Sequence, residues 1–209
     1  MTTSDQRFGF TRRTLLQALA ALLPILRLPI ASAAEPVAGS VSELTGEASA
    51  ELHKQNRKLK IDSALFLGDA LATGAQSRLA ALLGRKTSLR LGPETKVTLD
   101  TFIVNRGGEI ALASGAVLLD TGAGKFPKGL SIQSPFALIA VRGTRFFAGD
   151  IEGTFGVFAA RGVVDVTAGG KTVRLKAGEG TDIAHSGDAP GPVKKWGAPK
   201  IAKAMALVR

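Results

Sequence analysis

The residues with the clearest chemical potential form the run Arg142-Gly143-Thr144-Arg145. Two arginines that flank a glycine and a threonine can bind an anion, because a guanidinium group donates paired N–H groups to carboxylate or phosphate oxygens. Arg142 can equally serve the fold by tying adjacent turns together. The carboxylates available for that internal role belong to Asp150, Glu152, Asp165 and Glu179. The sequence therefore leaves two roles open for this run: contact with a ligand or partner, or an internal tie.

Other side chains offer little catalytic chemistry. Asp150 and Glu152 lie two residues apart and would share a strand face, but two acids beside a turn are more typical of a solvated surface than of an acid–base pair. His53 and His185 have no partner at metal-site spacing. Asp69 has a turn-like context in which a carboxylate caps backbone N–H groups. The chain has no cysteine, no nucleophile elbow and no phosphate-binding glycine loop. We predict a non-catalytic protein without metal or cofactor.

The first 34 residues have the three parts of an export signal. Arg12 and Arg13 precede an apolar segment, and Ala31-Ser32-Ala33 provides small residues for cleavage. The arginine pair is typical of the twin-arginine route. We expect residues 1–34 to be a helical signal peptide that is cleaved after Ala33, which places a soluble protein in the periplasm. The alternative is an uncleaved leader that anchors the chain in the inner membrane.

The formal net charge of +10 is unevenly distributed. The leader contributes +3, the residues after 187 contribute +4, and residues 35–187 carry only +3. A nucleic-acid-binding domain concentrates positive charge on its folded part, so nucleic acid is an unexpected partner. Within the body, residues 53–60 are basic and predict a solvated hairpin loop or a charged sheet edge. The alternative for this patch is contact with anionic glycan or lipid head groups.

The body between residues 37 and 183 has the pattern of an all-β protein. Short aliphatic and β-branched runs are interrupted by Gly, Pro, Asp or Asn about every 8–12 residues. We expect strands at residues 77–83, 88–91, 96–102, 109–113, 116–121, 130–133, 137–141, 155–159, 163–168 and 171–175. Residues 136–146 are apolar on both strand faces, with Arg142 on the face of Phe146, which predicts a strand covered on both sides.

The last part of the chain differs in composition from the body. Residues 187–199 contain Pro190, Pro192 and Pro199, which indicates an extended linker. Residues 200–208 could form a short helix, although its apolar stripe is poor. We therefore divide the chain into a signal peptide (1–34), an all-β domain (35–187), and a linker with a basic tail (188–209). Membrane contact is expected only through the leader or this tail.

Residues 134–146, Ser-Pro-Phe-Ala-Leu-Ile-Ala-Val-Arg-Gly-Thr-Arg-Phe, resemble the hallmark strand and turn of the FecR domain family. Residues 67–79 and 89–95 resemble earlier pieces of the family pattern, and residues 162–166 with 173–180 resemble its closing hairpin. Four pieces in the expected order cover roughly residues 64–183. The resemblance implies an elongated β-solenoid or β-roll fold, and a β-sandwich is the alternative that strand spacing leaves open.

The FecR resemblance also implies a function in extracytoplasmic sensing or protein–protein contact. Family members that regulate sigma factors carry a cytosolic segment, a membrane helix and a further C-terminal domain. This sequence has eleven residues before its arginine pair and 22 after residue 187, so we expect a stand-alone exported domain. The expected partner is another envelope protein. The alternative is a small anionic ligand bound near Arg142 and Arg145.

Overall fold

The computed structural model describes residues 35–103, 107–122 and 129–209, without the side chains of residues 101–103. The expected signal peptide, with Arg12, Arg13, Ala31 and Ala33, lies outside these residues. The body from Glu35 to Arg209 is a single compact unit. Among the described residues it contains two nine-stranded sheets, neither of them closed, and one helix.

The first sheet, sheet A, has the spatial order β18 (Lys194–Lys195), β17 (Glu179–Ile183), β14 (Thr154–Arg161), β13 (Arg145–Ile151), β10 (Ala116–Asp120), β7 (Thr87–Leu91), β6 (Arg78–Leu83), β1 (Val37–Thr45) and β4 (Ala64–Phe66). The second sheet, sheet B, has the order β16 (Lys171–Lys176), β15 (Val163–Ala168), β12 (Leu138–Val141), β11 (Leu130–Gln133), β9 (Gly107–Ser114), β8 (Lys96–Ile103), β5 (Ala70–Thr73), β2 (Ala48–Leu52) and β3 (Gln55–Lys58).

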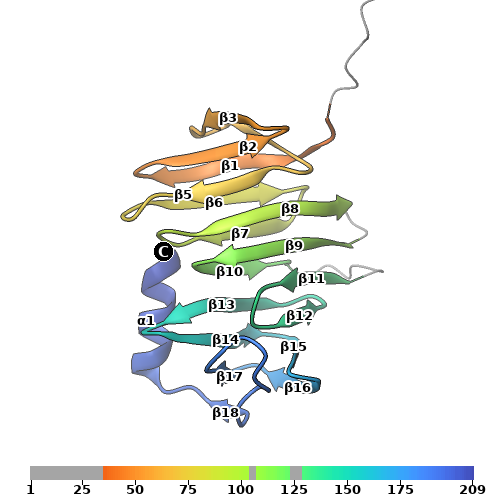
Figure 1. Cartoon of the computed structure of the whole chain (residues 1–209), viewed down its shortest axis with the longest axis vertical. Helices are drawn as coiled ribbons and strands as arrows, with labels where there is room; N and C mark the ends of the chain where they lie inside the picture. Colours follow the sequence, from red (N-terminus) through yellow and green to blue (C-terminus); the bar gives the residue numbers. More distant parts are fainter. Residues whose placement is uncertain (1–34, 104–106, 123–128) are drawn as a thin grey trace, which may run out of the picture. The chain divides into compact units, whose positions relative to one another are not determined.

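The chain builds the two sheets alternately. From β6 onward it places one or two strands in sheet A, then two in sheet B, and repeats this until β18. The stack therefore runs from β3 and β4 at one end to β16 and β18 at the other (Figure 1). Strand pairs are antiparallel throughout the described part, except for the parallel pair β9–β11. The all-β, coiled arrangement expected from the sequence is confirmed.

The main core lies between the two sheets because each strand alternates inward apolar and outward polar residues. In β7, Leu89 and Leu91 are fully buried, whereas Ser88 and Arg90 on the other face are half-buried. The same alternation buries Val164 and Val166 of β15. Residues from both sheets form one continuous apolar cluster. Packing of this cluster holds the body together without any disulfide.

The end of the chain is part of the folded body. Helix α1 (Ala198–Val208) and the preceding Trp196 pack on the outer face of sheet A. This second apolar cluster contains Ala116, Leu118, Phe147, Ile151, Phe158, Trp196, Ala204, Met205 and Val208. Figure 1 shows α1 running beside β13 and β14. The interpretation of residues 188–209 as a linker and a tail is therefore wrong for residues 196–208, because a poor apolar stripe made of small residues can still cover a flat sheet.

Two glycines of sheet A, Gly156 and Gly180, leave room for the Trp196 indole to pack against the sheet. A Cβ atom on Gly180 of β17 would lie 2.3 Å from Nε1 of Trp196, and one on Gly156 of β14 would lie 2.8 Å from its ring carbon Cη2. The indole also stacks on Phe158, with ring centroids 5.2 Å apart. The Lys200 ammonium lies 4.3 Å from the indole centroid, at cation–π distance. Trp196 is consequently only 6% exposed.

Helix α1 also explains which part of residues 136–146 is covered on both faces. In β13, Phe146 faces the inter-sheet core and Phe147 faces the helix, and both are fully buried. In β12, Ile139 is buried but Leu138 is 44% exposed. The prediction that residues 136–146 form one strand covered on both sides is therefore wrong for β12, because the chain turns from sheet B into sheet A at residues 142–144. In the described part of the chain, no helix is long and apolar enough to span a membrane.

Candidate functional site

The first three residues of the predicted run, Arg142-Gly143-Thr144, form the turn that carries the chain from β12 in sheet B to β13 in sheet A, and Arg145 is the first residue of β13. A second turn, between β14 and β15, makes the reverse crossing and lies against the first. A Cβ atom on Gly162 in this second turn would lie 3.0 Å from the Gly143 carbonyl oxygen. The two turns bring together four arginines and two aspartates, which we call the arginine corner: Arg142, Arg145, Arg161, Arg174, Asp120 and Asp165.

On the sheet A side of the corner, the carboxylate of Asp120 forms ion pairs with both Arg145 and Arg161. Asp120, Arg145 and Arg161 are cross-strand neighbours on β10, β13 and β14. Arg161 Nη2 donates to Asp120 Oδ1 at 2.7 Å, and Arg145 Nε lies 4.0 Å from Asp120 Oδ2. Half of the Arg161 side chain is exposed. This half of the corner therefore carries a net positive charge that faces solvent.

On the sheet B side, Arg142 and Arg174 line a hollow of about 450 Å³. Its other lining residues are Gly129, Ala140, Val141, Val163 and Asp165. Arg174 donates from Nε to Asp165 Oδ1 at 2.7 Å and from Nη2 to Asp165 Oδ2 at 3.0 Å. This bidentate pair fixes the Arg174 guanidinium at the rim of the hollow.

The pKa of Asp165 is lowered because Arg174 donates hydrogen bonds to its carboxylate; partial burial opposes this shift, and the positive charge of Arg174 adds to it. Asp165 is consequently ionised at neutral pH and balances Arg174. Arg142 is exposed, and no described carboxylate forms an ion pair with it. The hollow therefore has one uncompensated guanidinium beside the exposed apolar side chain of Val163.

The remaining two residues of the predicted run hold the corner in shape. Gly143 has a φ of 66°, a left-handed value that glycine adopts without strain. Thr144 is fully buried, and its backbone N–H donates to Oγ1 of Thr121 at 2.9 Å. The Thr144 carbonyl in turn accepts from the Thr121 N–H at 2.9 Å. These bonds present the two arginines on a rigid turn.

Arg142 does not tie turns together through any of the four acceptors proposed for it. Asp165 pairs with Arg174, and Asp150 Oδ1 accepts the Gly153 N–H at 2.8 Å. Glu152 pairs with Lys203, and Glu179 Oε2 accepts the Lys176 N–H. The predicted position of Arg142 on the strand face of Phe146 is wrong, because the strand ends at Val141 and the arginine follows it in an exposed turn.

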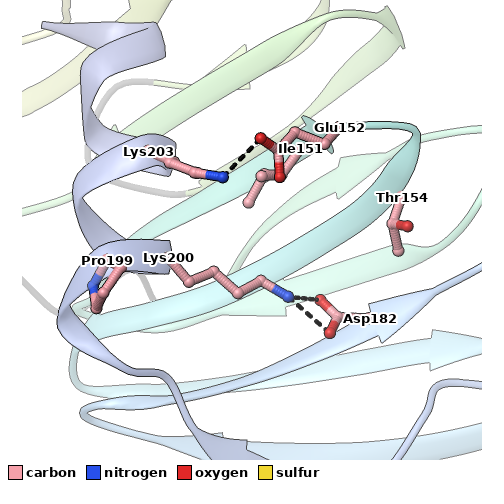
Figure 2. Close-up of a pocket in the computed structure, with 7 residues that line it drawn as sticks. All are labelled: Ile151, Glu152, Thr154, Asp182, Pro199, Lys200 and Lys203. Atoms are coloured by element: carbon pink, nitrogen blue, oxygen red, sulfur yellow. Dashed lines mark hydrogen bonds and ion pairs between the residues drawn. The ribbon is translucent and has the colours of Figure 1, made fainter.

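A second hollow, of about 420 Å³, lies between α1 and sheet A (Figure 2). Its charged groups are already paired. Lys200 Nζ donates to both carboxylate oxygens of Asp182 at 2.6 and 2.7 Å, and Lys203 Nζ donates to Glu152 Oε1 at 2.6 Å. Figure 2 shows these pairs connecting α1 to Asp182 of β17 and to Glu152 in the β13–β14 turn. They fasten α1 to the sheet and leave no free charge for a ligand.

The other singled-out residues have structural roles. Asp69 is fully buried; its Oδ2 accepts the Phe66 N–H at 2.7 Å, which confirms the predicted turn cap, and its Oδ1 accepts from Arg57 Nη1 at 2.9 Å. The basic segment 53–60 contains the turn and the second strand of the β2–β3 hairpin at the edge of sheet B, as predicted. His53 lies 3.5 Å from Glu35, and His185 lies 3.1 Å from Asp188. Among the described residues, no three histidine or acidic side chains gather as a metal site would require.

Sequence reasoning identified half of the arginine corner. It did not connect Asp120, Arg161 and Arg174 with the predicted run. The pairing of Asp165 with Arg174 could have been found, because the two-residue Gly169-Gly170 turn fixes the register of the β15–β16 hairpin. The contact between the two crossing turns depends on the stacking of both sheets, which local patterns do not encode.

The fold and the arginine corner together define a two-sheet β-stack that presents a cationic turn where the chain crosses between its sheets. Residues 69–165, just under half of the chain, match the family model described as FecR protein. These residues are a FecR domain, as the sequence resemblance predicted. The matched segment contains five of the six residues of the arginine corner; Arg174 lies beyond it.

Two crystal structures have a similar fold. Both are described as a "putative anti-sigma factor" from Parabacteroides distasonis, at 1.65 Å and 2.50 Å resolution. Each has a TM-score of 0.52 and 15% sequence identity, and the match covers 63% of this chain and 61% of that chain. This chain therefore corresponds to about three fifths of the length of the solved protein. No curated protein matches the chain.

Proposed function

We propose that this protein is a non-catalytic FecR-like module of the bacterial cell envelope, which recognises an acidic surface of another envelope protein through the arginine corner. The observation that carries the proposal is the position of the corner, which includes the turn that resembles the FecR hallmark, lies within the FecR match except for Arg174, and carries four arginines against two aspartates. The similar fold of a protein described as an anti-sigma factor supports a signalling context.

The charge and rigidity of the corner suit protein recognition. Arginine is enriched at binding hot spots because it combines a planar, charged head with a long apolar stem. Three of the four arginines are held by aspartates or by their strands, so little side-chain entropy is lost when a partner docks. The exposed Val163 adds an apolar contact beside them.

The envelope location rests on the leader. Arg12 and Arg13, the apolar segment after them and the small residues around Ala33 support twin-arginine export and release into the periplasm. An uncleaved leader would tether the same module to the inner membrane, with the arginine corner still available to a periplasmic partner.

Site-specific photo-cross-linking in the native cell tests this function. A photoreactive amino acid replaces Val163 at the corner, or Leu82 on the outer face of sheet A; these two side chains have similar exposure, 45% and 41%. We expect one discrete cross-linked product from position 163, absent from position 82 and lost when Arg142→Glu is added. Equal products from both positions, or none from position 163, would contradict the proposal.

The hollow beside Arg142 supports a second candidate function, the binding of a small anion. Arg142 has no described carboxylate partner there, and the hollow is large enough for a phosphate-sized group. Thermal unfolding of the full chain with millimolar inorganic phosphate or sulfate tests it. A rise in Tm that disappears in Arg142→Ala, with an unchanged Tm of the unliganded variant, supports this function. An unchanged Tm of the wild-type protein rejects it for these anions.

A further inference from the structure

Strand β16 (Lys171–Lys176) is the longest sheet edge in the described part of the chain. It pairs with β15 on one side and ends sheet B on the other. The remaining terminal strands are shorter: β3 has four residues, β4 has three and β18 has two. An unpaired edge strand presents a row of free backbone N–H and C=O groups that can hydrogen-bond to another extended chain.

The hydrogen bonding around β16 identifies which backbone groups point outward. The N–H of Lys176 donates to Glu179 Oε2 at 2.8 Å, so it points away from β15. Backbone groups alternate along an antiparallel strand, and the groups of Arg174 and Thr172 therefore point outward too. Both residues are exposed. The tight Gly169-Gly170 turn holds β16 on β15, so this edge is preformed.

The charges on β16 select its partner. Lys171, Arg174 and Lys176 are exposed, and the strand contains no acidic residue. Lysines on an edge strand discourage pairing with a second copy, because like charges then oppose each other. The same charges attract an acidic strand. The preceding strand supplies only Asp165, which Arg174 already engages.

We propose that β16 accepts an extended acidic segment of the partner protein as an added strand of sheet B. This inference rests on the proposed function and specifies its recognition mode. Backbone hydrogen bonds to Thr172 and Arg174 provide affinity, and side chains at alternate positions provide specificity. The side chains of Thr172, Arg174 and Lys176 lie on the solvent-facing side of sheet B, whereas the side chain of Leu175 faces the core. The added segment therefore has acidic residues at every second position.

Hydrogen exchange of the full chain with a synthetic peptide tests the inference. The probe is an eight-residue peptide with blocked ends, in which glutamate alternates with valine. We expect the backbone amides of Thr172 and Arg174 to exchange at least about tenfold more slowly when the peptide is bound. The edge strand β3 (Gln55–Lys58) serves as an internal control, because it is shorter and Arg57 is engaged by the buried Asp69. Its amides should not change.

Two matched controls separate strand addition from simple charge attraction. A peptide of the same sequence, N-methylated at alternate residues along its edge-facing side, should bind at least about tenfold more weakly, because it lacks the donor N–H groups. The double variant Lys171→Glu/Lys176→Glu should weaken binding of the unmodified peptide by a similar factor at low salt. The emission of the single tryptophan reports whether this variant is folded.

The outcomes are distinct. Equal binding of the methylated peptide, unchanged exchange at Thr172 and Arg174, or stronger protection at β3 than at β16 would each overturn strand addition. A cross-link from position 163 that persists in Lys171→Glu/Lys176→Glu would leave the docking function standing while rejecting β16 as its edge. Absence of that cross-link, with normal peptide protection at β16, would reject the proposed function alone.

Discussion

The substitution Gly180→Ala should release the C-terminal segment from sheet A. Gly180 forms the floor under the Trp196 indole, and the added methyl carbon would lie 2.3 Å from Nε1 and 2.5 Å from Cε2. Carbon atoms in comfortable contact are about 3.5–4.0 Å apart, so the indole would have to move by more than 1 Å. The Val157 carbonyl, 2.7 Å from the new atom, restricts relief by a shift of the strand.

The energetic cost follows from two limits. Overpacking a well-filled site typically costs about 1–3 kcal/mol. Complete loss of a buried tryptophan, as in Trp→Ala, costs about 3–5 kcal/mol. The loss of stability in Gly180→Ala should lie where these ranges meet, at about 3 kcal/mol, because the indole loses its contact with Phe158 and the start of α1 is displaced with it.

Trp196 is the only tryptophan, so its fluorescence reports this event directly. The wild-type protein should show the short-wavelength emission of a buried indole, and the variant should show red-shifted emission before global unfolding. Urea titration followed by fluorescence and by far-ultraviolet circular dichroism gives the free energy of unfolding from both probes.

Gly197→Ala is the matched control. Gly197 has an ordinary φ of −71°, and its added methyl group would meet nothing closer than Pro199 Cδ at 3.7 Å. This variant should keep the buried emission and lose less than about 1 kcal/mol, since alanine is a slightly poorer helix N-cap than glycine. Wild-type emission and wild-type stability in Gly180→Ala would refute the packing argument.

Three further substitutions test individual contacts. Arg57→Ala should destabilise the fold by about 3 kcal/mol, measured by urea unfolding, because the fully buried Asp69 carboxylate then keeps only its hydrogen bond from the Phe66 N–H. A loss below about 0.5 kcal/mol, as for a surface ion pair, would contradict this. Asp165→Asn should lose less than about 1 kcal/mol at pH 7, since the pair with Arg174 is partly exposed. The pKa of Asp165 is lowered in the folded state, so its contribution to stability is present above the unfolded pKa and fades as pH falls through the folded pKa. The stabilities of wild type and Asp165→Asn should therefore converge on acidification, and a gap that widens as pH falls would contradict this. Arg78→Ala should cost about 1 kcal/mol and fray the last turn of α1, seen as faster amide exchange there, because Arg78 donates to the carbonyls of Ala206 and Leu207.

Most of the sheet structure could be predicted because its rules are local. Alternating apolar residues and glycine-rich turns gave strands such as 88–91, 163–168 and 171–175 within one residue of β7, β15 and β16. The capping role of the Asp69 carboxylate was also predictable from its turn context. The FecR hallmark directed attention to residues 142–145, which lie where the chain crosses from β12 to β13.

The errors arose where distant segments meet. Apolar residues on both faces of a strand require a cover, and the cover on sheet A is α1, whose small residues give a weak stripe in the sequence. The predicted position of Arg142 on the face of Phe146 was wrong because the predicted strand was extended through a turn that crosses between the sheets. The arginine corner depends on contact between two such crossings, and Arg161 gave no sign of it in its local sequence.

We propose that the arginine corner binds an acidic surface of a partner protein. The decisive measurement is the affinity of this chain for the partner that cross-links from position 163. Purified partner is titrated against the wild-type chain, Arg142→Glu, and Lys54→Glu in the β2–β3 turn at the opposite end of the stack, a variant with the same change in charge. We expect at least about a tenfold loss of affinity for Arg142→Glu and an unchanged affinity for Lys54→Glu. Equal affinities for all three proteins, or equal losses in both variants, would contradict it.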